Sequence, residues 1–232
     1  MQDFAQQLQD FARRLDANPR VIRTRNEFDY EAKPPGWFDY MLPSFQEMYG
    51  FAFPEGVEQL LGFPEDVVIA WVADQTAVPP HLQRGVGAVE LTKLSMALHR
   101  PLYRINLPDN EDPRLDRAYM FDPCTELNSN PSVVWLAPES GPGFEGLGIL
   151  GRWELTPLPL TISEYLTHAL TWHGGFCWFY LYCDFADFCR LHSTTLSAVC
   201  NLLRLPELFP EADWSVVDTK REYFDFARPF AR

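Results

Sequence analysis

Two aspartates and a histidine in the last quarter of the chain are the side chains best suited to acid–base chemistry. Asp184 and Asp187 are three residues apart, so a helix would place both carboxylates on one face, where their repulsion could raise one pKa for general-acid work. With His192 they could form a hydrolase-type site. However, Phe185 and Phe188 follow the same helical spacing, which also indicates a helix N-terminus capped by Asp184.

Metal chemistry is the second possibility, because several thiols gather near His192. Zinc sites usually take their ligands from close Cys-x-x-Cys pairs, and no such pair occurs in this stretch. We therefore predict free structural thiols, a reducing compartment, and folding without metal or disulfides. The five cysteines are Cys124, Cys177, Cys183, Cys189 and Cys200.

Two glycine motifs suggest cofactor or ester chemistry, but both lack the context that such chemistry needs. Gly141–Gly146 matches the dinucleotide pattern Gly-x-Gly-x-x-Gly, yet no helix start or later acidic residue accompanies it, so a flexible loop is predicted. His173-Gly174-Gly175 is similar to a lipase oxyanion loop, but the chain has no Gly-x-Ser-x-Gly turn. The simpler interpretation is a glycine C-cap, with His173 favourable to the helix dipole. We expect no cofactor.

Charge is the strongest signal in the sequence. The formal net charge of −13 repels nucleic acids and anionic membranes, and it attracts basic protein surfaces. An acidic loop from Asp109 to Asp116 lacks the central glycine and distal glutamate of a calcium loop. We predict that it contacts a protein partner, with help from the glycine-rich loop that follows. The predicted partner-binding residues are Asp109, Glu111, Asp112, Asp116, Glu139 and Glu145.

Local patterns predict the helices that position these groups. Phe4, Leu8, Phe11 and Leu15 recur at helical spacing before Asn18-Pro19. Thr161-Ile162-Ser163-Glu164 is a capping box that starts a helix running to His173. Further helices are expected at residues 38–48, 55–61, 91–98 and 196–203.

Short apolar runs bounded by Pro, Asp and Asn predict strands in the middle of the chain. They are Val67–Val72, Leu102–Ile105, Ala118–Phe121, Val133–Leu136 and Trp153–Leu155, with a last edge strand at Trp214–Val217. Phe176–Tyr182 is either a core strand or the start of a buried helix. This order indicates one α+β domain over residues 1–232, with a mixed or antiparallel central sheet and helices at both ends.

Part of the chain also resembles a known family, the SUKH superfamily. In that family an early helix leads to a Gly-x-x-Leu-Pro turn and a short helix that ends in an apolar pair and a glycine. Here those places are taken by Gly50, Phe53-Pro54, Leu60-Leu61 and Gly62. Downstream, the strand ending in aspartate, the next strand and the closing helix are similar to Ala118–Asp122, Val133–Leu136 and Thr161–Leu170.

The resemblance implies a SUKH-like core over residues 38–172, between an N-terminal helical segment (1–33) and a C-terminal helical extension and tail (173–232). It implies no catalysis: many members look like immunity proteins that neutralise a toxin of the same bacterium, while others are scaffolds. We therefore expect a non-catalytic acidic protein, monomeric or weakly dimeric, that binds a basic toxin. The alternatives are a hydrolase using Asp184, Asp187 and His192, or a scaffold without a toxin partner. No signal peptide is recognisable, so we expect a cytoplasmic location.

Overall fold

The computed structural model describes most of the chain as two compact units. The described residues are 4–30, 65–92, 113–123, 131–137, 145–151 and 155–231, with Tyr40, Pro43, Ser44, Glu47, Gly56, Val57, Leu60 and Phe63. The first unit comprises Met1–Asn26, Val68–Val89 and Thr167–Arg232, and the second comprises Glu27–Val67 and Glu90–Leu166. Both units are discontinuous in sequence. The predicted segments 1–33, 38–172 and 173–232 divide the chain differently, and their boundaries stay a prediction.

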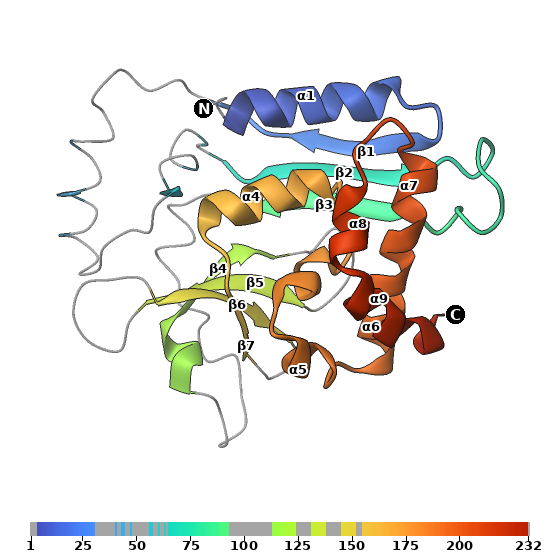
Figure 1. The fold of residues 1–232 in the computed structure, drawn as a ribbon. Helices are drawn as coiled ribbons and strands as arrows, with labels where there is room; N and C mark the ends of the chain where they lie inside the picture. Colours follow the sequence, from blue (N-terminus) through green and yellow to red (C-terminus); the bar gives the residue numbers. More distant parts are fainter. Residues whose placement is uncertain are drawn as a thin grey trace. The chain divides into compact units, whose positions relative to one another are not determined.

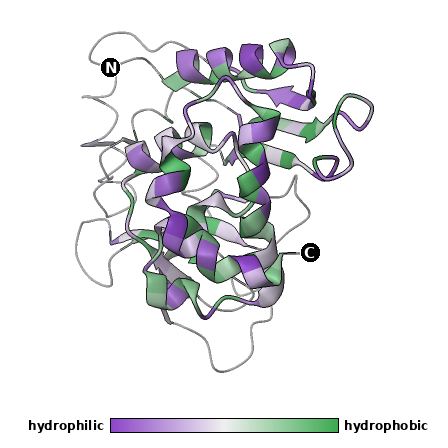
Figure 2. Ribbon diagram, turned by 45° about the vertical axis from the view of Figure 1, so that its right-hand side comes forward, coloured by the Kyte–Doolittle hydropathy of each residue, from purple (hydrophilic) through white to green (hydrophobic). Residues whose placement is uncertain are grey.

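The first unit begins with the predicted amphipathic helix and continues into a three-stranded sheet (Figure 1). Helix α1 (Phe4–Ala17) buries Phe4, Leu8, Phe11 and Leu15, as its spacing predicted, and Figure 2 shows hydrophilic and hydrophobic residues along it. The sheet has the order β1 (Val21–Glu27), β2 (Val67–Ala73), β3 (Val86–Leu91). The Asp74 amide donates to the Arg20 carbonyl and the Ala73 amide to the Gly85 carbonyl, each at 2.8 Å, so neighbouring strands are antiparallel.

A series of short helices completes the first unit. They are α4 (Ile162–Thr171), η4 (Trp178–Tyr182), α5 (Phe185–Phe188), α6 (Ser193–Asn201), η5 (Leu202–Arg204), α7 (Leu205–Leu208), α8 (Ser215–Thr219), α9 (Arg221–Ala227) and η6 (Arg228–Phe230); the first half of α4 belongs to the second unit. The strand predicted at Trp214–Val217 is wrong. The Asp213 carboxylate accepts the Ser215 amide at 2.9 Å, and this local bond starts a helical turn in place of a strand.

The capping box at the start of α4 is confirmed. The Glu164 amide donates to the Thr161 hydroxyl at 3.2 Å, and the Glu164 carboxylate accepts the Thr161 amide at 2.8 Å. At the other end, His173 and Gly174 have positive φ values of 52° and 63°, and the Gly174 amide donates to the Ala169 carbonyl at 2.8 Å. The predicted glycine C-cap is therefore present.

Loss of this N-cap has a testable cost. We expect Thr161→Ala to lower the free energy of unfolding by about 1 kcal/mol, because the Glu164 amide in the first turn of α4 loses its acceptor. Thr161→Ser keeps the hydroxyl and should stay within about 0.3 kcal/mol of the parent in urea titrations. Equal losses in both variants would show that the threonine methyl group, and not the cap, stabilises the helix.

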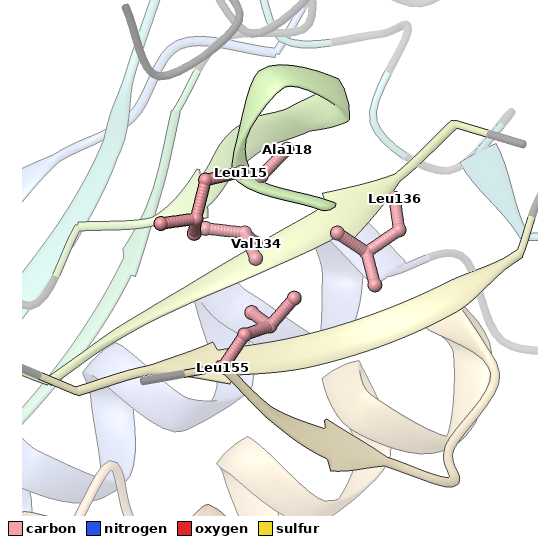
Figure 3. Packing of buried hydrophobic residues seen from close by; sticks show 5 residues of the cluster. All are labelled: Leu115, Ala118, Val134, Leu136 and Leu155. Atoms are coloured by element: carbon pink, nitrogen blue, oxygen red, sulfur yellow. The ribbon is translucent and has the colours of Figure 1, made fainter. Parts of the chain in front are cut away.

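The second unit contains a four-stranded antiparallel sheet. Its strands lie in the order β4 (Ala118–Asp122), β5 (Ser132–Leu136), β6 (Gly146–Leu150), β7 (Leu155–Leu158), and η2 (Pro113–Arg117) precedes them. All five residues of β5 are buried. Figure 3 shows Val134 and Leu136 of β5 near Ala118, Leu155 and the η2 residue Leu115. This apolar cluster fixes one side of the sheet.

Two sequence interpretations need correction here. The flexible loop predicted at Gly141–Gly146 is wrong at its last residue: Gly146 starts strand β6 (Gly146–Leu150), in which Gly148 pairs with Val134 and Pro157, and residues 141–144 lie outside the described residues. A Cβ on Gly148 would lie 2.8 Å from Leu155 Cδ1, so glycine permits the close packing of β6 against β7. Leu91 was expected in a helix and instead ends β3.

The α+β class is confirmed, and so are the strands at Val67, Ala118 and Val133. Phe176–Tyr182 resolves into a short 3₁₀-helix, η4. The strand expected at Leu102–Ile105 and most of the helices expected at residues 38–48, 55–61 and 92–98 lie outside the described residues. In the part of the chain that the structure describes, no helix could span a membrane.

Candidate functional site

Of the six acidic residues predicted to bind a partner, the structure describes the surroundings of one. Asp109, Glu111, Asp112 and Glu139 lie outside the described residues, and for Asp116 only the backbone, within η2, is described. Glu145 is described and lies directly before β6. The six residues all belong to the second unit.

Glu145 is tied to the edge of the β4–β5 hairpin. Its amide donates to the Leu136 carbonyl at 3.0 Å, and its carboxylate lies 2.7 Å from Nη1 of Arg117. Arg117 also donates to the Ala137 carbonyl at 2.7 Å. The guanidinium therefore offsets the charge of Glu145, which makes this residue a weaker contact for a basic partner than an unpaired carboxylate would be.

Charge is divided unequally between the two units. The residues of the first unit include twelve acidic and twelve basic side chains, so its formal net charge is zero. The residues of the second unit include twenty acidic and seven basic side chains, so its formal net charge is −13. The whole net charge of the protein thus belongs to one unit.

In the first unit, several acidic and basic side chains neutralise each other in local ion pairs. Three of them join residues three positions apart on a helix or at its end: Arg190 with Asp187, Arg221 with Asp218, and Arg228 with Asp225. Arg13 pairs with Asp10 in the same way on α1. Exposed pairs of this kind stabilise the fold little, but they leave a weak long-range field.

Known proteins give no further guide to this arrangement. No protein-family model, curated protein or solved structure matches the chain. The division of charge and the local geometry are therefore the basis for any functional conclusion.

The three residues of the hydrolase alternative each make a local contact, two as helix caps and one in an ion pair. The Asp184 carboxylate accepts the Ala186 amide at 2.8 Å and caps α5, and Asp187 pairs with Arg190 at 3.3 Å. His192 caps α6, because its Nδ1 accepts the Thr194 amide at 3.4 Å, and Nδ1 also lies 2.9 Å from the Thr194 hydroxyl. Within the described residues, no hydrogen bond or ion pair joins either aspartate to His192.

The cysteines that the structure describes are free, and most are buried. Cys177, Cys183 and Cys200 are buried and Cys189 is half-buried, while Cys124 lies outside the described residues. Burial raises the pKa of Cys183 to about 12, and it also raises the pKa of Cys177, so both stay protonated at neutral pH. Thiols of this kind are poor nucleophiles and poor metal ligands. The described residues contain no group of histidine, cysteine and acidic side chains placed to hold a metal.

Sequence reasoning missed one polar network in the first unit. Nε1 of Trp172 donates to the Tyr182 hydroxyl at 3.2 Å, and that hydroxyl lies 3.0 Å from Nδ1 of His168. The ammonium of Lys220 lies 3.9 Å from the centre of the Tyr182 ring. Trp172 follows His168 by one helical turn, which the sequence shows, but the positions of Tyr182 and Lys220 depend on tertiary packing.

The chemistry of this network is that of a half-buried structural cluster. Burial raises the pKa of Tyr182 and lowers that of Lys220, so the phenol stays protonated at neutral pH. The phenol can then donate to His168 while it accepts from Trp172, which satisfies all three groups. The network therefore ties α4 to η4 and to the start of α9.

Proposed function

We propose that this chain is a non-catalytic acidic binding protein whose second unit binds a basic protein partner. The observation that carries the proposal is the division of charge: twenty acidic and seven basic residues lie in the second unit, while the first is neutral. A unit with a net charge of −13 attracts a cationic surface over a distance set by the Debye length. A neutral first unit does not compete for that partner.

The partner that best fits this chemistry is a basic bacterial toxin, which makes the chain an immunity protein. Toxins that cleave nucleic acids need positive charge to bind phosphates, so an acidic protein can be steered onto the same surface. The partial SUKH resemblance agrees with this role. Two parts of that resemblance, the strand ending at Asp122 and the closing helix, are joined by the Tyr165 hydroxyl, which donates to the buried Asp122 carboxylate at 2.5 Å. We also propose a cytoplasmic location, because the buried thiols fit a reducing compartment. A monomer or weak dimer stays part of the proposal.

Affinity purification from the native cell, followed by mass spectrometry, tests the proposal directly. The expected result is a basic protein with a toxin domain. A captured partner that is acidic or neutral would contradict the proposal. A basic partner without toxin activity would contradict the role as an immunity protein and favour the role as a scaffold protein.

Steering by the second unit can be tested with two charge-matched variants. We expect the triple variant Asp109→Asn, Glu111→Gln, Asp112→Asn to slow association with the captured partner by about tenfold at low salt and to flatten its salt dependence. The control Asp218→Asn, Glu222→Gln, Asp225→Asn removes the same charge from the first unit and should change the rate less than about threefold. Association rates at two salt concentrations provide the measurement. Equal salt slopes for the triple variant and the parent would place the contact elsewhere, with the acidic residues between Glu27 and Asp66 next to be tested.

A further inference from the structure

A groove in the first unit brings together charges of both signs. Its accessible volume is about 350 Å³, and it lies between the turn that joins α1 to β1 and the connection that follows α7. Its lining includes two basic residues, Arg14 and Arg20, and one acidic residue, Glu211. Ala17, Pro19 and Pro210 add apolar surface. The groove belongs to the neutral unit, so it is separate from the acidic unit of the proposed function.

Among the described residues the charged residues of the groove form no ion pair, although the charge of Arg14 also acts on the Asp10 carboxylate one turn earlier on α1. Among the described residues, no ion pair or hydrogen bond engages the guanidinium of Arg14 or the carboxylate of Glu211. In the same unit, other exposed arginines such as Arg13, Arg190 and Arg221 pair with an aspartate three positions away. Opposite charges that line one groove without pairing leave their binding capacity for a ligand.

The walls of the groove are held in place by hydrogen bonds that span the sequence. The side-chain amide of Asn18 donates to the Leu208 carbonyl at 2.8 Å, and its oxygen accepts the Arg20 amide at 2.9 Å. Nη1 of Arg20 donates to the Glu207 carbonyl, which orients the guanidinium and leaves its other N–H groups available. Arg20 is therefore positioned before a ligand arrives, which lowers the entropic cost of binding.

The two ends of a zwitterion match these groups. A guanidinium pair favours a carboxylate, because each guanidinium can donate two parallel hydrogen bonds to it. The last carbonyls of α1 and the Glu211 carboxylate disfavour a bare anion and favour an ammonium. From this geometry we infer that the groove binds a free α-amino acid, with its carboxylate on Arg14 and Arg20, its ammonium towards Glu211, and an apolar side chain against Pro19 and Pro210.

The probe for this inference is L-leucine, with two analogues that each lack one charged group. Isocaproate keeps the carboxylate and lacks the amine, and isopentylamine keeps the amine and lacks the carboxylate. Titration of the full chain, followed by amide chemical shifts, should show leucine binding at least about tenfold more tightly than either analogue. The shifts should map to residues 14–18, to Arg20 and to Glu211, because Pro19 and Pro210 carry no amide proton.

Variants separate the groove from general charge effects. The pair Arg14→Gln, Arg20→Gln should weaken leucine binding at least about tenfold, and Glu211→Gln should remove the preference for leucine over isocaproate. Arg190→Gln, in the same unit but paired with Asp187 and outside the groove, removes the same type of charge and should leave leucine binding unchanged. The inference is wrong if leucine causes no shifts, if isocaproate or inorganic phosphate binds as tightly as leucine, or if Arg190→Gln weakens binding as much as the arginine pair does.

Discussion

Replacing Gly174 with alanine is expected to lower the free energy of unfolding by about 3–5 kcal/mol, enough to unfold much of the protein. The φ angle of Gly174 is +63°, where side chains other than hydrogen are strained. An added Cβ would also lie 2.4 Å from the Ala88 oxygen and 2.5 Å from the Ala88 carbonyl carbon. Both are backbone atoms, so no side chain can rotate away to relieve the contact.

Ala88 is held in that position by the same turn. Its amide donates to the Gly174 carbonyl at 2.9 Å, and Gly87 forms an antiparallel bridge with Gly175. Moving the strand to admit a methyl group would break both contacts. The close approach of the α4 C-cap to β3 therefore requires glycine.

Gly146 provides a control for backbone strain without a clash. Its φ angle is +154°, and an added Cβ would meet nothing within 4 Å. We expect Gly146→Ala to cost only about 1 kcal/mol, because the strain is not joined by a steric clash. Urea unfolding of both variants measures the difference. Equal losses would mean that the contact with Ala88 relaxes freely.

The second large effect comes from His173, whose ring is buried among aromatic side chains. The ring is 5% exposed and stacks on Phe209 and Trp214, with centroid distances of 4.2 and 5.3 Å, while Phe11 lies edge-on at 5.8 Å. Nδ1 lies 3.1 Å from the Thr171 carbonyl, which can only accept, so this nitrogen carries the proton of the neutral ring. Burial is the main cause that lowers the pKa of His173 to about 4; the hydrogen bond to Thr171 opposes this shift, and the nearby cation of Arg14 adds to it. The ring is uncharged at neutral pH, so the expected favourable interaction of His173 with the helix dipole is wrong.

This low pKa makes stability depend on pH in a defined window. The unfolded chain binds the proton with the ordinary histidine pKa of 6.5, and the folded chain binds it only near pH 4. The contribution of the neutral ring is therefore fully present above pH 6.5 and is lost as the pH falls to 4. We expect about 3 kcal/mol of stability to disappear across this range, since each pKa unit corresponds to about 1.4 kcal/mol.

A comparison of variants isolates this histidine from the carboxylates that titrate at low pH. Urea unfolding measures how far the free energy of unfolding falls between about pH 7 and pH 4. This fall should be smaller in His173→Phe than in the parent, by about 3 kcal/mol. His192→Asn removes an exposed histidine and keeps a residue that can cap α6, so it should follow the parent curve. If His173→Phe and the parent have parallel curves, protonation of His173 does not control acid stability.

The sequence by itself determined those elements whose hydrogen bonds and apolar faces are local. The spacing of Phe4, Leu8, Phe11 and Leu15 determined α1, because a helix with that pattern has one buried face. Thr161 and Glu164 determined the start of α4, because the two residues satisfy each other's amides. β2, β4 and β5 are runs of mostly buried apolar residues. Many of these residues are β-branched or aromatic, and such residues favour strands.

Only the tertiary structure decided the elements that depend on partners far along the chain. β1 is polar over most of its length and β6 is rich in glycine, so neither has a strand signal of its own, and each forms because neighbouring strands supply hydrogen bonds. The sequence shows that acidic residues gather in particular stretches, but only the structure assigns those stretches to one unit, because each unit is assembled from separate parts of the chain. The groove has the same origin: Asn18 meets the Leu208 carbonyl across 190 positions of sequence, and no local pattern can predict a contact that long-range packing alone creates.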